Sequence, residues 1–444
     1  MARILVSSMP FAGHVAPMAA VAAELVRRGH YVAGYTGAKY ADQFVTAGAS
    51  WVPWTRPPDF DDANLAATFP NVGYGRGLRG ALIVSRYVLF GTSSGQAEDI
   101  LAAARQQPFD LIVADQLALG AALAGEVLGT PWASVMVIPL SMTSKHLPPG
   151  GVPVRPATGP IGRARDAVLR RIARELYRRF GTSLNSRMRA SVGLAPSPVD
   201  GPDSLFSPYL VVAQGVPGLE YPRPDLPPHV HFVGRLASAD PPKSAAQLPS
   251  WWPDLSVARA AGRPIVHVTQ GTLNLDPADL LRPASAGLAG QEPLVVCTTG
   301  GLPSSIIEPL PDNVRAAPYL PYDQLLPLVD VMVTNGGWGG VLAAVEAGVP
   351  LVVAGGSLDK PEVARRVAWS GVGLDLRTGR PSPRRVRRAV AQVLRSPQLR
   401  QRARELGEAI TAAGGTVAAG DLIEALLATP EQRVTAHPPR DRRG

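Results

Sequence analysis

A glycine-rich turn in the second half of the sequence has the features of an anion-binding site. The apolar run Val331–Thr334 is followed by Asn335, Gly336, Gly337, Trp338, Gly339 and Gly340, and then by a helical pattern. Glycines let a ligand approach the backbone closely, and free N–H groups at a helix N-terminus attract negative charge. The turn therefore predicts a phosphate site, although a tight strand-to-helix turn without a ligand would have the same pattern. Its spacing is neither G-x-G-x-x-G nor that of a P-loop, so it does not favour NAD or ATP-dependent phosphoryl transfer.

Two further loops of the same half follow apolar runs and carry polar side chains. Asp359 and Lys360 come after the run Leu351–Ala354, and Thr272 comes after another such run. A carboxylate at a strand end can accept hydrogen bonds from sugar hydroxyls, but Asp359 could equally cap the helix that begins near Pro361. The hydroxyl of Thr272 could contact the same phosphates, or its segment could be an ordinary turn.

The first half offers a histidine and a carboxylate at the ends of two expected strands. His14 lies in a loop after the run Ile4–Ser7, and Asp115 ends the run Leu111–Ala114. Taken alone, His14 would more often be a surface or core residue. Neighbouring parallel strands can bring the two side chains together, and the carboxylate would then fix the imidazole tautomer and raise its basicity. The pair is a candidate general base.

Short apolar runs alternate with helical patterns along the chain, which is typical of parallel α/β sheets. The expected strands are Ile4–Ser7, His30–Tyr35, Leu111–Ala114, Ala133–Ile138, Ile265–Thr269, Leu294–Thr298, Val314–Ala317, Val331–Thr334 and Leu351–Ala354. We expect a doubly wound, Rossmann-like domain over 1–235, a linker over 236–263, a second such domain over 264–428 and a disordered tail over 429–444. The carboxyl ends of both sheets should face one cleft, where such folds bind ligands.

Two segments of the first domain do not follow this alternation of strand and helix patterns. Residues 55–95 show little regular period but carry several aromatic side chains. Residues 163–180 predict an Arg-rich helix with apolar residues at every fourth position. That helix could rest on anionic lipid, but a solvated face with extended arginines is the favoured interpretation.

Composition narrows the class of protein. The chain has 444 residues, of which 46% are hydrophobic, so a large core can be buried and disorder is excluded as the main state. The formal net charge is +9, yet only four of the 44 basic residues are lysines. This bias indicates the codon usage of a GC-rich genome rather than a nucleic acid partner.

The single cysteine excludes a disulfide framework and a cysteine zinc site. Because no apolar run approaches the ~20 residues that span a bilayer, we expect a cytoplasmic chain without stable membrane insertion.

Together these motifs resemble the GT-B glycosyltransferases of the UDP-glycosyltransferase superfamily, and most of all the bacterial enzymes that glycosylate macrolides, polyketides and other natural products. The resemblance runs from Gly13–Pro17 to about residue 425 and is strongest over Thr334–Gly340 and Asp359–Gly371. It implies two Rossmann-like domains that face each other across a cleft. It also implies transfer of a sugar from a UDP- or TDP-sugar to a hydroxyl of a small lipophilic acceptor, with inversion and without a metal or other cofactor.

The resemblance also implies roles for individual residues. His14 would be the general base, and Asp115 would orient it and balance its charge. The donor diphosphate would be bound by Thr272, Asn335, Gly336, Gly337, Trp338, Gly339 and Gly340. The donor sugar would be held by Asp359 and Lys360, and the nucleoside would lie beside Leu320, Tyr322 and Gln324. The acceptor would be lined by residues 55–95 and Met136–His146, with contacts from Phe11, Phe60, Tyr74, Tyr87, Phe90 and Met136.

The sequence departs from the commonest pattern of that family at three positions. Asn335 stands where many members have a histidine, and its amide can donate a hydrogen bond but cannot become cationic. Ala343 stands where a glutamate often binds the ribose hydroxyls. Lys360 replaces the usual glutamine after the sugar-binding aspartate. Because an ammonium group is charged and an amide is neutral, we expect a preference for the donor sugar that differs from that of the common pattern.

Two other functions remain open from the sequence. A UDP-sugar 2-epimerase of the same architecture would use the diphosphate loop but would need carboxylates around the anomeric carbon. A non-catalytic auxiliary protein would bind the sugar nucleotide without needing a base at His14 and Asp115. The sequence also leaves open whether the chain forms a homodimer.

Overall fold

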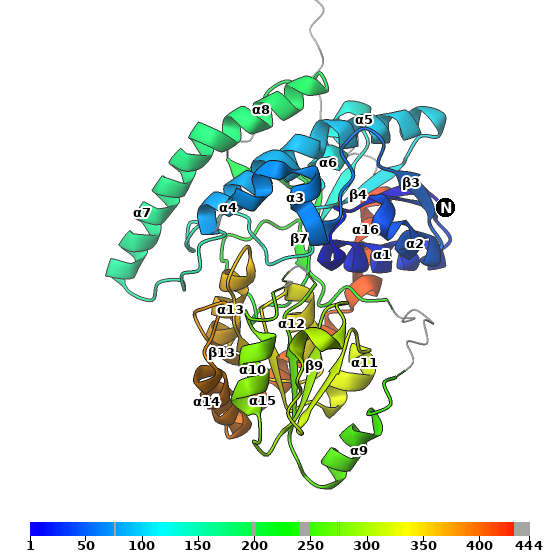
Figure 1. Ribbon diagram of the computed structural model, residues 1–444. Coiled ribbons are helices and arrows are strands. Elements are labelled where there is room, and N and C mark those ends of the chain that lie inside the picture. The colour runs from blue at the N-terminus through cyan, green and yellow to red at the C-terminus, as the bar shows by residue number, and fades with distance from the viewer. Residues whose placement is uncertain (75–76, 198–200, 239–247, 273, 275, 430–444) are drawn as a thin grey trace, which may run out of the picture.

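The computed structural model describes residues 1–74, 77–197, 201–238, 248–272, 274 and 276–429. It contains two parallel β-sheets, one in each half of the chain, which lie one above the other in Figure 1. Helices pack on both sheets, so the expected pair of Rossmann-like α/β domains is confirmed. The predicted tail lies outside the described residues from position 430 onward.

The N-terminal sheet has seven parallel strands in the order β3-β2-β1-β4-β5-β6-β7. They are β1 (Arg3–Ser7), β2 (Tyr31–Thr36), β3 (Ser50–Pro53), β4 (Leu111–Asp115), β5 (Trp132–Met136), β6 (Leu210–Ala213) and β7 (Val230–Phe232). The helices of this half are α1 (Ala12–Arg27), α2 (Ala41–Thr46), α3 (Leu65–Thr68), α4 (Gly77–Val84), α5 (Phe90–Gln106), α6 (Leu119–Leu128), α7 (Pro160–Leu176) and α8 (Thr182–Ser191).

The C-terminal sheet has six parallel strands in the order β10-β9-β8-β11-β12-β13. They are β8 (Ile265–Thr269), β9 (Leu294–Thr298), β10 (Val314–Ala317), β11 (Val331–Thr334), β12 (Leu351–Val353) and β13 (Gly373–Asp375). The helices of this half are α9 (Pro253–Ala260), α10 (Leu281–Leu288), α11 (Tyr322–Leu325), α12 (Trp338–Glu346), α13 (Lys360–Ser370), α14 (Pro383–Leu394), α15 (Pro397–Ala412) and α16 (Gly415–Ala428).

The strand register sets where the functional loops begin. In the first sheet, Ser7 of β1 pairs with Ala114 of β4, so the loop after β1 and Asp115 lie at the same edge. In the second sheet, Thr334 of β11 pairs with both Thr269 of β8 and Val353 of β12. The three loops that leave these strands therefore start side by side at the carboxyl edge, where doubly wound sheets bind ligands.

All of the expected strands are present, with bounds that agree within two residues. The sequence patterns missed β3, β6, β7 and β13, which have only three or four residues each and are too short for a clear period. Residues 55–95, where the sequence shows little regular period, contain the short helices α3 and α4 and the start of α5.

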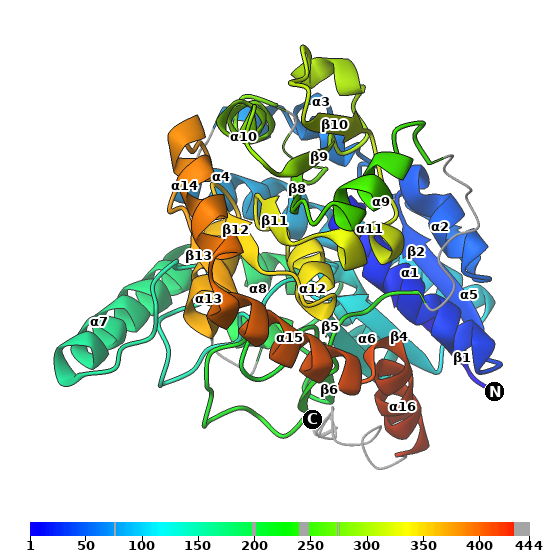
Figure 2. The same cartoon turned by 90° about the horizontal axis from the view of Figure 1, so that it is seen from below.

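Two helices, α9 in the expected linker and α16 at the end of the described chain, pack differently from the predicted domain boundaries. The expected linker contains α9, whose Leu255 and Ala258 are buried in the core of the C-terminal domain. The last helix, α16, leaves that domain and packs Ile423 and Leu426 into the core of the N-terminal domain, beside α1 (Figures 1 and 2). The boundary predicted at residue 428 therefore assigns α16 to the domain that precedes it in sequence rather than to the one it packs on.

The stretch Pro397–Ala428 is long and apolar enough to cross a membrane by length and composition. In the structure it is two helices, α15 and α16, which are broken at Gly414. Leu406 of α15 and Ile423 of α16 are buried in the cores of different domains. Packing within the protein thus accounts for part of the apolar character of the stretch, of which 33% is buried.

The Arg-rich helix forms as expected, as α7 followed by a π-helical segment over Tyr177–Gly181. It lies at the edge of the molecule, away from both sheets in both views (Figures 1 and 2). Its apolar residues Val168, Ile172 and Phe180 are more than half exposed. The apolar face of this helix is therefore turned to solvent.

Candidate active site

The helix α1 begins earlier than expected, so His14 lies in its first turn rather than in the preceding loop, and its side chain meets the end of β4. His14 Nδ1 lies 2.7 Å from Asp115 Oδ2, although the two residues are 101 positions apart. Asp115 also accepts the backbone N–H groups of Met9, at 3.1 Å to Oδ2, and of Leu117, at 3.1 Å to Oδ1. Because both carboxylate oxygens act as acceptors, Nδ1 of His14 carries the proton and Nε2 keeps its lone pair. The pair has the geometry of an oriented base.

The surroundings of His14 make it more basic than an ordinary histidine. Burial lowers the pKa of His14, but the charge and hydrogen bond of Asp115 outweigh burial, and the carboxylates of Asp359 and Asp62 add to their effect. The net result is a pKa of His14 above its usual 6.5. Asp359 belongs to the C-terminal domain, so a charge of the predicted donor-sugar loop contributes to the basicity of the predicted base.

Asp62 supports the N-terminus of α1, the helix that carries His14, and was missed by sequence reasoning. Its Oδ2 accepts the N–H of Ala12, the first residue of α1, at 2.9 Å. The preceding residue, Phe11, provides no side-chain cap for this helix. Asp62 also accepts a hydrogen bond from the hydroxyl of Tyr40 at 2.8 Å. It lies in the irregular segment 55–95, and no spacing in the sequence relates it to α1.

An aromatic wall adjoins the base. The ring centroids of Phe11 and His14 are 5.5 Å apart, those of Phe11 and Phe60 are 5.3 Å apart, and those of Phe60 and Phe69 are 5.5 Å apart. Trp54 meets Phe60 edge-on at 5.9 Å. Two of the residues predicted to line the acceptor, Phe11 and Phe60, are therefore placed next to His14, although both are largely buried.

The other predicted acceptor residues lie differently. Tyr87 and Phe90 are half-buried and pack against the same aromatic core. The side chain of Tyr74 lies outside the described part of the structure. Met136 ends β5 and is fully buried in a cluster with Leu140 and Val211. A direct acceptor contact from Met136 is therefore not supported in this conformation.

The glycine-rich turn joins β11 to α12 in a conformation that exposes backbone N–H groups. Gly336 has φ +90°, a left-handed conformation that residues with a β-carbon rarely adopt. Gly337 caps α12 with no side-chain hydrogen bond, so the N–H groups of Trp338, Gly339 and Gly340 in the first helical turn have no partner within the helix. These groups and the helix dipole favour an anion at this end of α12.

Two predicted diphosphate ligands are partly committed elsewhere. The amide of Asn335 donates to the backbone carbonyl of Gln270, and its oxygen accepts the N–H of Gly337 at 3.3 Å. Asn335 thus ties the loop after β8 to the glycine turn, which places Thr272 beside it. The ring of Trp338 is 2% exposed and packs on Gly215 of the N-terminal domain, so only its backbone N–H is available to a ligand.

The conformation of Gly336 leads to a testable expectation. A β-carbon at this position would lie 2.9 Å from Cγ1 of Val353, in addition to the unfavourable φ. We expect Gly336→Ala to lower the free energy of unfolding by about 1–3 kcal/mol and to weaken UDP or TDP binding. Thermal melting and titration calorimetry would measure the two effects.

Gly339→Ala is the matched comparison for stability, since a β-carbon there meets nothing within 4 Å. Its melting temperature should equal or exceed that of the wild type, because alanine favours a helix over glycine. An unchanged melting temperature in Gly336→Ala would contradict the strain assigned to this turn.

Asp359 and Lys360 stand where β12 gives way to α13. Asp359 occupies the N-cap position of α13 but makes no side-chain capping bond, so the capping alternative is not observed. The preceding Leu358 has φ +54°, a strained conformation for a leucine, and such strain concentrates at functional sites. Lys360 is buried, and its backbone carbonyl lies against Gly336 and Gly355. The donor-sugar loop and the glycine turn are therefore in contact.

The predicted nucleoside residues are only partly free to bind a ligand. The hydroxyl of Tyr322 lies 3.2 Å from Nε2 of His267, a fully buried histidine, so it is turned into the domain interior. Burial raises the pKa of Tyr322 to about 12, against the opposing hydrogen bonds of Thr269 and Thr298. A nucleoside contact through this hydroxyl is thus not supported. Leu320 is largely buried, while Gln324 is exposed and available.

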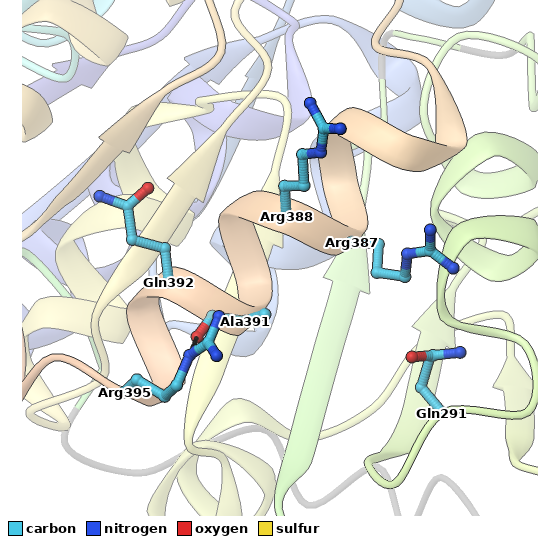
Figure 3. Close-up of a pocket in the computed structure, with 6 residues that line it drawn as sticks. All are labelled: Gln291, Arg387, Arg388, Ala391, Gln392 and Arg395. Atoms are coloured by element: carbon cyan, nitrogen blue, oxygen red, sulfur yellow. Dashed lines mark hydrogen bonds between the residues drawn. The ribbon is translucent and has the colours of Figure 1, made fainter.

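A pocket elsewhere in the C-terminal domain does not involve these residues. It is lined by Gln291, by Arg387, Arg388, Ala391 and Gln392 of α14, and by Arg395 just after that helix (Figure 3). None of the predicted site residues lines it. Within the described residues there is also no group of three or more His, Cys, Asp or Glu side chains arranged to hold a metal ion.

Comparisons with known proteins agree with the geometry. Residues 292–424 match the model of the erythromycin biosynthesis protein CIII-like C-terminal domain. The chain is 39% identical over 427 residues to 4'-demethylrebeccamycin synthase of Lentzea aerocolonigenes, covering 96% of this chain and 100% of that protein. Among solved structures it resembles CalG4, the calicheamicin glycosyltransferase, with a TM-score of 0.71 at 22% identity over 97% of this chain and 99% of that one. It also resembles the glycosyltransferase VinC in complex with dTDP, with a TM-score of 0.67 at 22% identity over 96% and 99% of the two chains.

The two facing Rossmann-like sheets thus form a GT-B fold, as the resemblance implied. The chain belongs to the erythromycin CIII-like family of GT-B natural-product glycosyltransferases.

Proposed function

We propose that the chain transfers a sugar from a UDP- or TDP-sugar to a hydroxyl of a small lipophilic natural product, with inversion and without a metal. The observation that carries this proposal is the 2.7 Å contact between His14 and Asp115. A relative named for rebeccamycin synthesis and a structural neighbour with bound dTDP support the acceptor class and the donor class.

The reaction follows from this placement as a single displacement. Nε2 of His14 takes the proton of the acceptor hydroxyl while the acceptor oxygen bonds to the anomeric carbon from the face opposite the diphosphate. The bond between that carbon and the diphosphate oxygen breaks, and the diphosphate leaves with the electron pair. Backbone N–H groups of the glycine turn and the N-terminus of α12 stabilise the charge that develops there. Asp359 holds the sugar hydroxyls, and the aromatic wall at Phe11 and Phe60 receives the acceptor.

The first experiment is an acceptor-dependence assay. Release of UDP or TDP would be measured from a panel of sugar nucleotides, with and without pooled polyketide, indole-derived and phenolic acceptors. The proposal expects release that requires an acceptor and a new glycoside of matching amount. Conversion of the sugar nucleotide without any acceptor would favour the 2-epimerase instead, and binding without turnover in any pool would favour an auxiliary protein.

The pH dependence of the reaction follows from the pKa of His14. Only the neutral imidazole can accept a proton, and its pKa lies above the usual 6.5 because Asp115 stabilises the charged form. We therefore expect kcat/KM to rise with pH through a midpoint above 6.5 and to level off once His14 is neutral. A midpoint at or below that value, or a rate that falls as pH rises through it, would contradict the assignment of His14 as the base.

A further inference from the structure

Arg366 of α13 is a buried cation that connects the two domains. It is 1% exposed and is the largest fully buried side chain of the described residues. Its Nε donates to Oε2 of Glu220 in the N-terminal half at 2.8 Å, and its Nη1 donates to Oε1 of Glu362 in α13 at 2.6 Å. The guanidinium also lies over the ring of Tyr221, 4.8 Å from its centroid. Burial lowers the pKa of Arg366, but the two carboxylates outweigh burial and hold it above its usual value.

Each of the two carboxylates uses its other oxygen to hold the loop that follows β5. Oε1 of Glu220 accepts the N–H of Leu140 at 3.3 Å. Oε2 of Glu362 accepts the N–H of Gly151 at 2.7 Å. We call residues 137–153 the acceptor loop, since they include most of the segment expected to line the acceptor. Arg366 is thus connected to the acceptor loop at two points, to Leu140 through Glu220 and to Gly151 through Glu362.

Neighbouring arginines hold the same loop through its carbonyl groups. Arg365 donates from Nε to the carbonyl of Pro153 at 3.0 Å. Arg223 donates to the carbonyls of Leu140 and Met142, at 2.7 and 2.5 Å. The backbone groups of Leu140, Met142, Gly151 and Pro153 are therefore bonded by side chains around Arg366 rather than by a regular element, so the position of this part of the loop depends on the network. Other points of the loop are held by Asp203 and Asp225, at Thr143 and Lys145.

The network also reaches the donor side through a rigid helix. α13 begins directly after Asp359, and Arg366 follows Asp359 by seven residues, about 10 Å along the helix axis. An α-helix of this length moves as one body, so a shift at Arg366 is also a shift at Asp359. A buried ion network of this kind contributes little net stability, because desolvation offsets the attraction between the charges. Its effect is to fix geometry, and a two-pronged guanidinium suits that purpose.

We propose that Arg366 is a positioning residue for glycosyl transfer, which holds the acceptor loop at a fixed place relative to the donor-sugar loop at Asp359. The inference rests on the proposed function for its catalytic consequence, but not for its structural one. Loss of the network should let the acceptor loop move away from the donor while leaving the diphosphate site intact. Donor bound in that state would be lost to water more often than to the acceptor.

The structural consequence is tested by hydrogen exchange, which needs no activity. Arg366→Lys keeps the charge but cannot reach both carboxylates in a fork. We expect the peptides that contain Leu140 and Gly151 to exchange about tenfold faster in this variant. Arg315→Lys is the matched control, because the Nε of Arg315 donates to Oδ2 of Asp254 at 2.7 Å within the C-terminal domain. It should leave both peptides at the wild-type rate.

A second variant guards against misfolding. The double change Arg366→Met with Glu220→Leu removes the two most deeply buried charges together, while Glu362, which is more exposed, keeps its bond from the N–H of Gly151. It should fold, and it should show the same faster exchange at Gly151. Wild-type exchange rates at Leu140 and Gly151 in both folded variants would overturn the proposal, whether or not the chain is a transferase.

The catalytic consequence is tested by the fate of the sugar. We expect the fraction of released UDP or TDP that is matched by glycoside to fall, and kcat/KM for transfer to drop by about 100-fold, as for misplaced reactants. The dissociation constant of the free nucleotide diphosphate should stay at the wild-type value. If exchange is faster but the fraction of released UDP or TDP that is matched by glycoside is unchanged, Arg366 has a structural role only. Absence of transfer in the wild type as well would instead count against the proposed function.

Discussion

Replacing His14 with alanine should lower kcat/KM for glycosyl transfer by about 10³-fold, the loss typical of a general base. Nε2 of His14 carries the lone pair that accepts the acceptor proton, because Nδ1 is bound to Asp115 at 2.7 Å. Without the imidazole, the hydroxyl must attack with its proton still attached or pass it to water. The donor site lies in the other domain, so binding of UDP or TDP should not change. Steady-state transfer rates and nucleotide calorimetry on the same preparation would measure both quantities.

His229→Ala serves as the control for this variant, since His229 is a half-buried loop residue before β7 that contacts none of the site. Its transfer rate should equal that of the wild type. The assignment fails if His14→Ala retains the wild-type rate, or if it loses nucleotide binding to the same extent as transfer.

Asp115→Asn should lower kcat/KM nearly as much as His14→Ala, although it replaces only one carboxylate oxygen with an amide nitrogen. The asparagine amide would present a donor to Nδ1 of His14, so the imidazole would accept there and carry its proton on Nε2, where the base is needed. Such an inversion of the tautomer costs up to ~10⁴-fold in related base–carboxylate pairs. The buried amide would also lose one of the two backbone bonds from Met9 and Leu117. We expect kcat/KM to fall by about 10²–10⁴-fold.

Nitrogen NMR of labelled histidine would report the tautomer of His14 directly. It should change from Nδ1-protonated in the wild type to Nε2-protonated in Asp115→Asn. Asp110→Asn is the matched control, because Asp110 accepts the N–H of Arg3 at 2.8 Å just before the opposite end of β4. Loss of activity in Asp110→Asn, or a wild-type rate in Asp115→Asn, would argue that the carboxylate does not act through the imidazole.

The meeting of His14 and Asp115 could be predicted because it depends on local rules. Each residue follows a short buried run, and parallel neighbouring strands bring their carboxyl ends to one edge of the sheet. The same rule predicted that the loops at Thr272, the glycine turn and Asp359 would lie together. Most of the fold and the positions of the catalytic loops could therefore be predicted from strand periodicity and turn residues.

Side-chain orientation could not be predicted in the same way. Tyr322 belongs to the expected nucleoside loop, yet its hydroxyl is turned inward to His267, because a buried histidine needs a partner. Met136 ends β5, next to the strand that carries Asp115, but its side chain is buried against Leu140 and Val211. Asn335 was expected to face the diphosphate and also closes the loop at Gln270. In each case a buried neighbour, invisible in the local sequence, decides the direction.

Contacts between distant segments were the least predictable. Glu220 and Arg366 are 146 positions apart, and no pattern relates them until the two domains are placed together. The return of α16 to the N-terminal domain is similar, because its bonds to Arg28 and His30 through Glu424 join the two ends of the chain. Such contacts depend on the arrangement of whole domains, which short-range periodicity does not encode.

The central claim is a direct displacement in which His14 activates the acceptor on the face opposite the departing diphosphate. It is tested most directly by the anomeric configuration of the product, read from the coupling constant of the anomeric proton in the glycoside formed by the wild type. An α-linked sugar nucleotide should yield the β-glycoside only. An α-glycoside as the sole product would contradict a single displacement and with it the role given to His14 and Asp115.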